Sequence, residues 1–271
     1  MAFLNFKYIL RKSTGMLHKA FSKLNMQANS EECLEIVRLA AAEKYYGPVI
    51  RIGDAGDGSY IVPKDLSGIV ASVSPGVNRE YEFDLELGRI GIKSYMFDAS
   101  IDKPKDLTAM QEFHKLFLDT YESSTTISLP KVVQNIGAEQ GQNLLLQMDI
   151  EGAEYRCVNA TDIATLNRFA VIILELHDFD IFTRNKLYNR FWLLPFLVKL
   201  RKNHNVLHVH PNNQRETSLV HGIDIPNVLE ITLVHKQRWP PPSGTEFDTW
   251  SLDFVTNEHL PYTPVSNHWF M

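Results

Sequence analysis

Short, nearly continuous apolar runs recur along the middle of the chain. The clearest lie at 69–73, 144–148 and 170–174 and consist mostly of Ile, Val, Leu and Ala. Runs of this kind are typical of strands that are buried on both faces of a parallel sheet. Segments with helical spacing lie between them, at about 79–87 and 129–136. The pattern predicts an α/β fold with a mostly parallel, seven-stranded sheet flanked by helices.

The remaining strands are expected from weaker patterns. Lys93–Asp98 is predicted as the second strand and Phe113–Leu118 as a short third strand. The alternating segments Val206–His210 and Val228–Val234 are predicted as the last two strands, at an antiparallel edge of the sheet. Trp250–Val255 is a further candidate for an edge strand.

Helical spacing also frames the sheet in the sequence. Glu31–Tyr46 has apolar residues on one face, with Ser30 as a candidate cap and Gly47–Pro48 as a stop. Phe179–Leu200 predicts a strongly apolar helix that is interrupted at Pro195. The expected segments are a basic amphipathic N-terminal arm (1–28), a packing helix (29–48), a main domain (49–236) and an extended C-terminal extension (237–271).

Charge is distributed unevenly along the chain. The net charge is −5, but the first 30 residues carry +5 and the remainder −10. Apolar residues recur at helical intervals among the early cations, so this arm is expected to bind an anionic membrane surface or to pack on a partner subunit. No apolar run reaches the ~20 residues that a membrane span needs. Bulk acidity argues against nucleic acid as a partner.

The two cysteines, Cys33 and Cys157, give neither a disulfide framework nor a zinc motif. They fit a reducing compartment. We therefore expect a cytoplasmic protein, with a peripheral location on the inner face of the membrane as an extension of that expectation.

The most informative stretch is Leu144–Glu154. Its apolar run ends in two acids, Asp149 and Glu151, followed by Gly152, which permits a sharp turn. In open α/β sheets ligands bind outside the carboxyl ends of the strands, so both carboxylates are candidates for chemistry. The alternative is that they cap the helix that follows.

Three more positions point to a cofactor site at the same edge. Ser74 and Gly76 follow the first strand, and this loop lacks the spaced glycines that a dinucleotide pyrophosphate requires. Asp98 ends the second strand, where Rossmann-like folds place the carboxylate that binds ribose hydroxyls. The alternative for Asp98 is an exposed strand-end acid.

Histidines add candidate bases or metal ligands. Glu175 and His177 end the third of the clear apolar strands, while His208 and His210 share one face of a predicted strand. Together with His177 and nearby acids, His208 and His210 form a candidate divalent-metal site. A metal-free site is favoured because no compact ligand motif is present.

The segment Leu146–Glu154, Leu-Gln-Met-Asp-Ile-Glu-Gly-Ala-Glu, resembles the signature of FkbM-type methyltransferases. Other blocks resemble that family in the same order, and the resemblance covers the chain from about residue 49 to 235. These blocks are Arg51–Gly53, Asp57–Pro63, Tyr95–Asp98, Phe113–Lys115, Glu175–Asp178, His208–Asn213 and Val228–Thr232.

The resemblance implies a Rossmann-like class I methyltransferase domain over 49–236. It implies an enzyme that uses S-adenosylmethionine to O-methylate a sugar hydroxyl on a cell-surface glycan or its precursor. The expected cofactor-binding residues are Asp57, Tyr60, Ser74, Gly76, Asp98 and Asp149. The expected catalytic residues are His177 as base, with Asp149, Glu151 and Glu175 as orienting acids, and the acceptor side is expected at His210 and Asn213.

Two other functions fit parts of the pattern. Acids at strand ends also suit a metal-dependent glycosyltransferase, in which a divalent ion binds the phosphates of a nucleotide sugar. A membrane-associated adaptor that kept the fold without catalysis would need the N-terminal arm but not the site.

Overall fold

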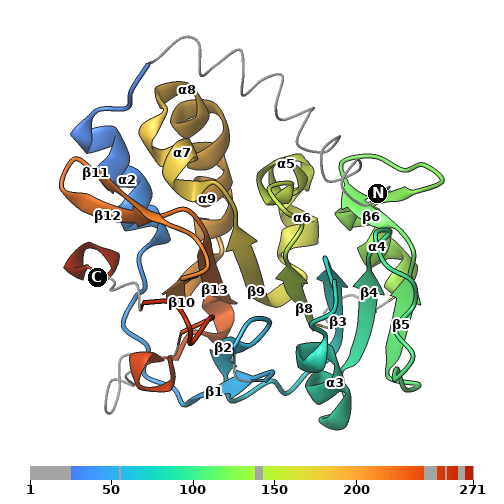
Figure 1. Cartoon of the computed structure of the whole chain (residues 1–271). Helices are drawn as coiled ribbons and strands as arrows, with labels where there is room; N and C mark the ends of the chain where they lie inside the picture. Colours follow the sequence, from blue (N-terminus) through green and yellow to red (C-terminus); the bar gives the residue numbers. More distant parts are fainter. Residues whose placement is uncertain are drawn as a thin grey trace.

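A computed structural model describes residues 26–54, 56–137, 143–240, 249–253, 255–261 and 266–270. Its centre is a seven-stranded sheet with the order β10-β13-β9-β8-β3-β4-β5 (Figure 1). The strands are β3 (Ile69–Pro75), β4 (Lys93–Phe97), β5 (Gln111–His114), β8 (Asn143–Met148), β9 (Phe169–Leu176), β10 (His204–Pro211) and β13 (Leu229–His235). The predicted α/β class and the number of strands in this sheet are confirmed.

The sheet is mixed. Strands β5, β4, β3, β8 and β9 pair in parallel, whereas β13 pairs antiparallel with both β9 and β10. The expected antiparallel edge is confirmed: β13 lies next to β9, and β10 forms the edge itself. The N-terminal end of β13 consequently lies beside the carboxyl ends of the parallel strands.

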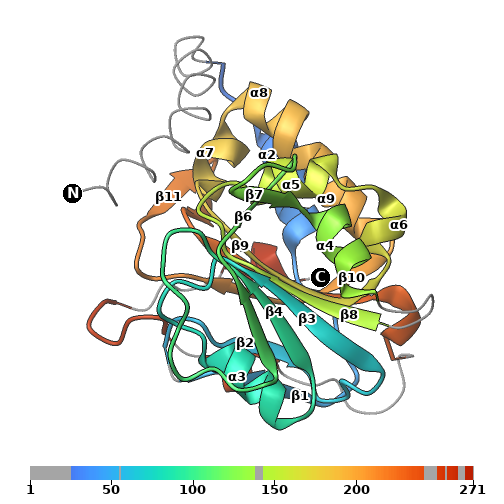
Figure 2. The ribbon, with the colours of Figure 1, turned by 90° about the vertical axis from the view of Figure 1, so that its right-hand side faces the viewer.

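Each face of the sheet buries its own core. Leu144, Leu146 and Met148 of β8 pack into the larger core with the helices α2 (Ser30–Ala40) and α9 (Leu194–Arg201), while Leu145 faces a smaller core. That smaller core is formed with α3 (Glu82–Arg89) and a hairpin of β1 (Val49–Ile52) and β2 (Tyr60–Pro63), which cover the opposite face (Figures 1 and 2). Burial on both sides explains why the β8 sequence is nearly continuous in apolar residues rather than alternating.

The helices and smaller strands surround this sheet. The helices are α2 (Ser30–Ala40), α3 (Glu82–Arg89), α4 (Leu129–Ile136), α5 (Glu154–Ala160), α6 (Ile163–Leu166), α7 (Phe179–Arg184), α8 (Lys186–Tyr188) and α9 (Leu194–Arg201). The paired small strands are β1 (Val49–Ile52) with β2 (Tyr60–Pro63), β6 (Phe117–Asp119) with β7 (Thr126–Ser128), and β11 (Thr217–Val220) with β12 (Ile223–Pro226).

Local chemistry moved several expected boundaries. Helix α2 is capped by Asn29, not Ser30, through a reciprocal capping box with Glu32. The apolar segment after Phe179 is not one helix: a π-helical turn (Asn189–Leu193) leads into α9, which places Pro195 in its first turn, where a missing N–H costs nothing.

One predicted strand differs in its bounds, and another does not form. The third strand ends at His114, because the Leu116 N–H bonds back to the His114 carbonyl and turns the chain before β6. In place of the edge strand over Trp250–Val255, a 3₁₀ turn (Thr249–Leu252) forms. Of the N-terminal arm, only residues 26–28 lie within the described residues. Within the described chain, no helix is both long and apolar enough to cross a membrane.

Candidate active site

The turn after β8 lies directly against the loop after β3. Gly76 has a φ of +89°, and a Cβ atom built there would stand 1.4 Å from the Asp149 carbonyl oxygen. The Asp149 N–H also bonds to the Pro75 carbonyl at 3.1 Å. Only glycine allows this backbone contact, so the requirement for Gly76 is steric as well as conformational.

Glu154 organises the turn from inside the protein. Its side chain is fully buried, and its Oε1 atom accepts hydrogen bonds from the Ile150 N–H at 2.9 Å and the Gly152 N–H at 3.2 Å. Glu151 is exposed and adopts a φ of 57°. Of the acids in this stretch, Glu154 is therefore the one inside the protein, and the orienting role expected for Glu151 stays a prediction.

Glu154 also orients His177. The His177 Nδ1 atom lies 3.2 Å from Glu154 Oε1, while Nε2 lies 3.7 Å from both Asp149 Oδ1 and Glu175 Oε1. The Tyr155 hydroxyl donates to the His177 carbonyl at 2.9 Å and fixes the backbone of this residue. The ends of β8 and β9 thus bring Asp149, Glu175 and His177 together as predicted from their strand positions.

The proton affinities follow from this crowding. Burial lowers the pKa of His177, but the charges of Glu154, Asp149 and Glu175 outweigh burial and raise it well above the ordinary value of 6.5. Burial raises the pKa of Asp149 to about 7, and neighbouring acids add to the effect. The pKa values of both groups are therefore raised, and the two groups titrate as a coupled pair.

Glu230 is a site residue that sequence reasoning missed. It stands opposite Glu175 in the β13–β9 register, and the Asn212 side-chain amide donates to both carboxylates, at 3.3 Å and 3.4 Å. Burial raises the pKa of Glu230 to about 7 and that of Glu175 well above its ordinary value. The sequence does show an acid near the start of a predicted strand. That acid reaches the site only because β13 runs antiparallel to β9.

Asp57 reaches this group from the loop between β1 and β2. One oxygen atom from each of Asp57, Glu175 and Glu230 lies within 4.8 Å of the others. The Gln214 side chain donates to Asp57 Oδ2 at 2.8 Å and holds it there. The structure thus brings Asp57 to the same edge as Asp149 and Glu175.

Asp98 marks the other end of the site. Its carboxylate accepts from the Asn78 N–H at 3.0 Å and from the Ser100 N–H at 2.7 Å. An open hollow lies beside it, with about 1250 Å³ of empty space when adjoining solvent is included. This hollow is lined by Asn78, Arg79, Tyr81, Ser100, Ile101, Asp102 and Pro104.

Ser74 and Tyr60 lie in a buried network. The Ser74 hydroxyl bonds to Gln147 at 2.7 Å and to Asp84 at 3.0 Å, and Gln147 donates to the Tyr60 hydroxyl at 3.1 Å. Burial raises the pKa of Asp84 to about 7. The hydrogen-bond capacity of Ser74 is directed into the protein; its contact with a cofactor stays a prediction.

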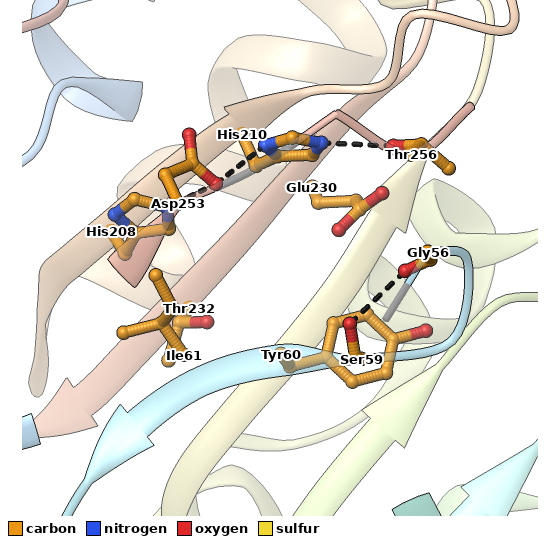
Figure 3. Close-up of a pocket in the computed structure, with 10 residues that line it drawn as sticks. All are labelled: Gly56, Ser59, Tyr60, Ile61, His208, His210, Glu230, Thr232, Asp253 and Thr256. Atoms are coloured by element: carbon orange, nitrogen blue, oxygen red, sulfur yellow. Dashed lines mark hydrogen bonds and ion pairs between the residues drawn. The ribbon is translucent and has the colours of Figure 1, made fainter. Parts of the chain in front are cut away.

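His208 and His210 do not join His177. They bind Asp253 instead: His210 Nδ1 lies 2.8 Å and His208 Nε2 lies 3.5 Å from Asp253 Oδ1 (Figure 3). The other ring nitrogen of His210 contacts the Thr256 hydroxyl at 2.9 Å. The less favoured metal site that combined all three histidines is therefore not formed: His177 groups with Asp149 and Glu175, and His208 and His210 group with Asp253.

Asn213 fastens the C-terminal segment to the main domain. Its side-chain amide donates to the carbonyls of Asn257, Leu260 and Pro261, and its oxygen accepts from the Asn257 N–H at 2.8 Å. Asp253 and Thr256 of this segment thereby become part of the wall around His210. The acceptor-binding role expected for His210 and Asn213 stays a prediction.

The comparison with known families covers the core of this site. Residues 76–206 match the model of the methyltransferase FkbM domain, and this range contains Gly76, Asp98, Asp149, Glu175 and His177. No curated protein and no solved structure matches the chain significantly. The resemblance to the FkbM methyltransferase family that the sequence predicts is confirmed over residues 76–206.

Proposed function

We propose that this protein is an S-adenosylmethionine-dependent O-methyltransferase that acts on a sugar hydroxyl of a cell-surface glycan or its precursor. The family match supports methyl transfer. The observation that carries the choice of a hydroxyl acceptor is the Glu154–His177 pair, in which a buried carboxylate orients an imidazole at the carboxyl edge of the sheet. The sugar rests on the family resemblance.

The residues present fit the cofactor. Asp98 offers carboxylate oxygens for ribose hydroxyls beside an open hollow, and Tyr81 and Ile101 give that hollow an apolar surface suited to a purine ring. Asp149 offers carboxylate oxygens to the ammonium group of the methionine portion, and that cation would lower the Asp149 pKa from the value of about 7 that burial gives it. The residues proposed for the cofactor lie at the carboxyl ends of the parallel strands, where open α/β sheets bind their ligands. This position supports a Rossmann-like class I methyltransferase fold.

The protein's own task is to orient the acceptor and to remove its proton. When bound, S-adenosylmethionine supplies an electrophilic methyl group on a good leaving group. In our proposal His177 Nε2 accepts the hydroxyl proton, and Glu154 at 3.2 Å stabilises the resulting imidazolium. Asp149 and Glu175, each 3.7 Å from Nε2, position the hydroxyl.

A divalent ion is the alternative means of acidifying the hydroxyl. Oxygen atoms of Asp149 and Glu175 and a ring nitrogen of His177 all lie within 4.8 Å of one another, which fits such an ion. We favour the metal-free base because the Glu154 contact already orients the imidazole. Adding Mg²⁺ or Mn²⁺ to metal-depleted enzyme should then leave turnover unchanged. A large rise in turnover would show that a metal ion, and not a histidine base, activates the hydroxyl.

The test is a transfer assay with cofactor labelled in the methyl group and a panel of oligosaccharides. His177→Ala should lower turnover by about 10²–10⁴ while cofactor affinity stays nearly constant. Asp224→Ala, at an exposed acid on β12, is the matched comparison and should leave turnover nearly unchanged. Near-normal turnover of His177→Ala would exclude His177 as the base. A melting temperature that rises with nucleotide sugars but not with S-adenosylmethionine would favour a glycosyltransferase.

A further inference from the structure

We propose that His208, His210 and Asp253 bind a transition-metal ion of the zinc class, at a site separate from the His177 cluster. The proposal does not depend on methyl transfer. It would join the C-terminal segment to the edge of the sheet through a metal ion.

The strand geometry places the two imidazoles together. His208 and His210 are two residues apart on β10 and therefore project from the same face. Asp253 approaches them from the segment after Leu252, and one ligand atom from each of the three residues lies within 4.8 Å of the others. These side chains are only 4%, 9% and 8% exposed, so the group is preformed and shielded from water.

The chemistry of the donors selects the metal. Two imidazole nitrogens and one carboxylate oxygen suit zinc and its neighbours, whereas Mg²⁺ and Ca²⁺ prefer all-oxygen sites. Asp253 Oδ1 is shared by both imidazoles, at 2.8 Å and 3.5 Å, distances that the ligands of one small ion would also show.

The surroundings supply what a metal site needs beyond its ligands. If His210 binds the ion through Nδ1, its Nε2–H donates to the Thr256 hydroxyl at 2.9 Å, and this contact fixes the ring. The three ligands border a pocket that Tyr60, Glu230 and Thr232 also line (Figure 3). This pocket leaves room for a fourth ligand, such as water.

The test uses the full chain, purified without a histidine tag and titrated with Co²⁺ as a spectroscopic substitute for Zn²⁺. We expect one equivalent to bind and to produce visible absorption typical of low-coordinate Co²⁺. Asp253→Asn and His208→Gln should each weaken binding at least about 100-fold, and Thr256→Val by about 10–100-fold. Asp224→Asn, at an exposed acid on β12, should bind as the unchanged chain does.

Thermal melting separates loss of the site from loss of the fold. Zn²⁺ should raise the melting temperature of the unchanged chain and of Asp224→Asn, but not that of Asp253→Asn or His208→Gln. Absence of Co²⁺ binding would overturn the proposal. Binding that survives Asp253→Asn but disappears in His177→Ala would overturn it as well, by assigning the ion to the other cluster.

Discussion

At the scale of single residues, the site concentrates acids around one imidazole. Three carboxylates lie within 3.7 Å of His177, and their charges outweigh the burial that would otherwise lower its pKa. A base must be unprotonated to accept a proton, so a raised pKa moves the acid limb of activity upward in pH. Activity should therefore fall as the pH drops through a value above 6.5, rather than near 6.5 as an unperturbed histidine would give.

Glu154→Gln tests the origin of that pKa. Glutamine keeps an oxygen atom for the Ile150 and Gly152 N–H groups but removes the charge that lies 3.2 Å from His177 Nδ1. The pKa of His177 should fall, as measured by NMR titration of its ring proton, and the acid limb of activity should move to lower pH. Glu151→Gln removes an exposed charge from the same turn and should leave the titration nearly unchanged. An unaltered pKa in Glu154→Gln would contradict the assigned role of Glu154.

Asp98→Ala tests the cofactor end of the site. S-adenosylmethionine binding should weaken by roughly 1–3 kcal/mol, because ribose hydroxyls would lose a buried acceptor. Asp106→Ala is the matched control, since Asp106 lies on the same loop, is exposed and does not line the hollow. Calorimetry measures both dissociation constants. Equal affinities in the two variants would exclude Asp98 from the cofactor site.

At the scale of elements, most of the site residues that the sequence predicts lie at the ends of strands. Asp149, Glu175, His177 and Asp98 were expected at one edge because each follows an apolar run, and parallel strands end on the same side of a sheet. Glu230 was missed because it comes near the start of its strand. Only the antiparallel pairing of β13 brings that start to the carboxyl edge.

Contacts between distant segments were beyond sequence patterns. Nothing near Asp253 in the sequence indicates that Asp253 and Thr256 return to His210 on β10, because these contacts span more than 40 residues. Likewise, Glu151 and Glu154 are indistinguishable as acids in one motif. Their roles separate only once the left-handed backbone at Glu151 turns its side chain to the surface.

Gly76→Ala tests the contact between two of these elements. A Cβ at Gly76 would meet the Asp149 carbonyl oxygen at 1.4 Å, so the β8 turn must move away as well as tolerate a φ of +89°. We expect the free energy of unfolding to fall by about 3 kcal/mol or more. Gly91→Ala has a similar φ of +86° with no atom within 4 Å, and it should cost only about 1–2 kcal/mol. Denaturant titration compares them, and equal losses would show that backbone conformation alone explains the requirement.

At the scale of the whole molecule, the charge asymmetry separates the N-terminal arm from the body. The first 30 residues carry +5 and the rest −10, so an anionic bilayer would attract one and repel the other. The predicted arm of residues 1–28 overlaps the folded body at its end: the Ala28 N–H bonds to the Arg184 carbonyl at 2.8 Å, and Ala28 is buried. A truncation that tests the arm should therefore remove residues 1–25 and retain Met26 onward.

We predict that the full chain sediments with anionic liposomes at low salt and that the chain without residues 1–25 does not. Each surface cation contributes about 1 kcal/mol near an anionic membrane, and Lys7, Arg11, Lys12, Lys19 and Lys23 all lie in the removed segment. Replacing these five residues by Gln retains the apolar positions and should weaken binding strongly, as should raising the salt concentration. Neutral liposomes should bind the full chain much less. Equal sedimentation of the full and truncated chains would end the membrane proposal, and a truncation that instead changes the oligomeric state would assign the arm to a contact between subunits.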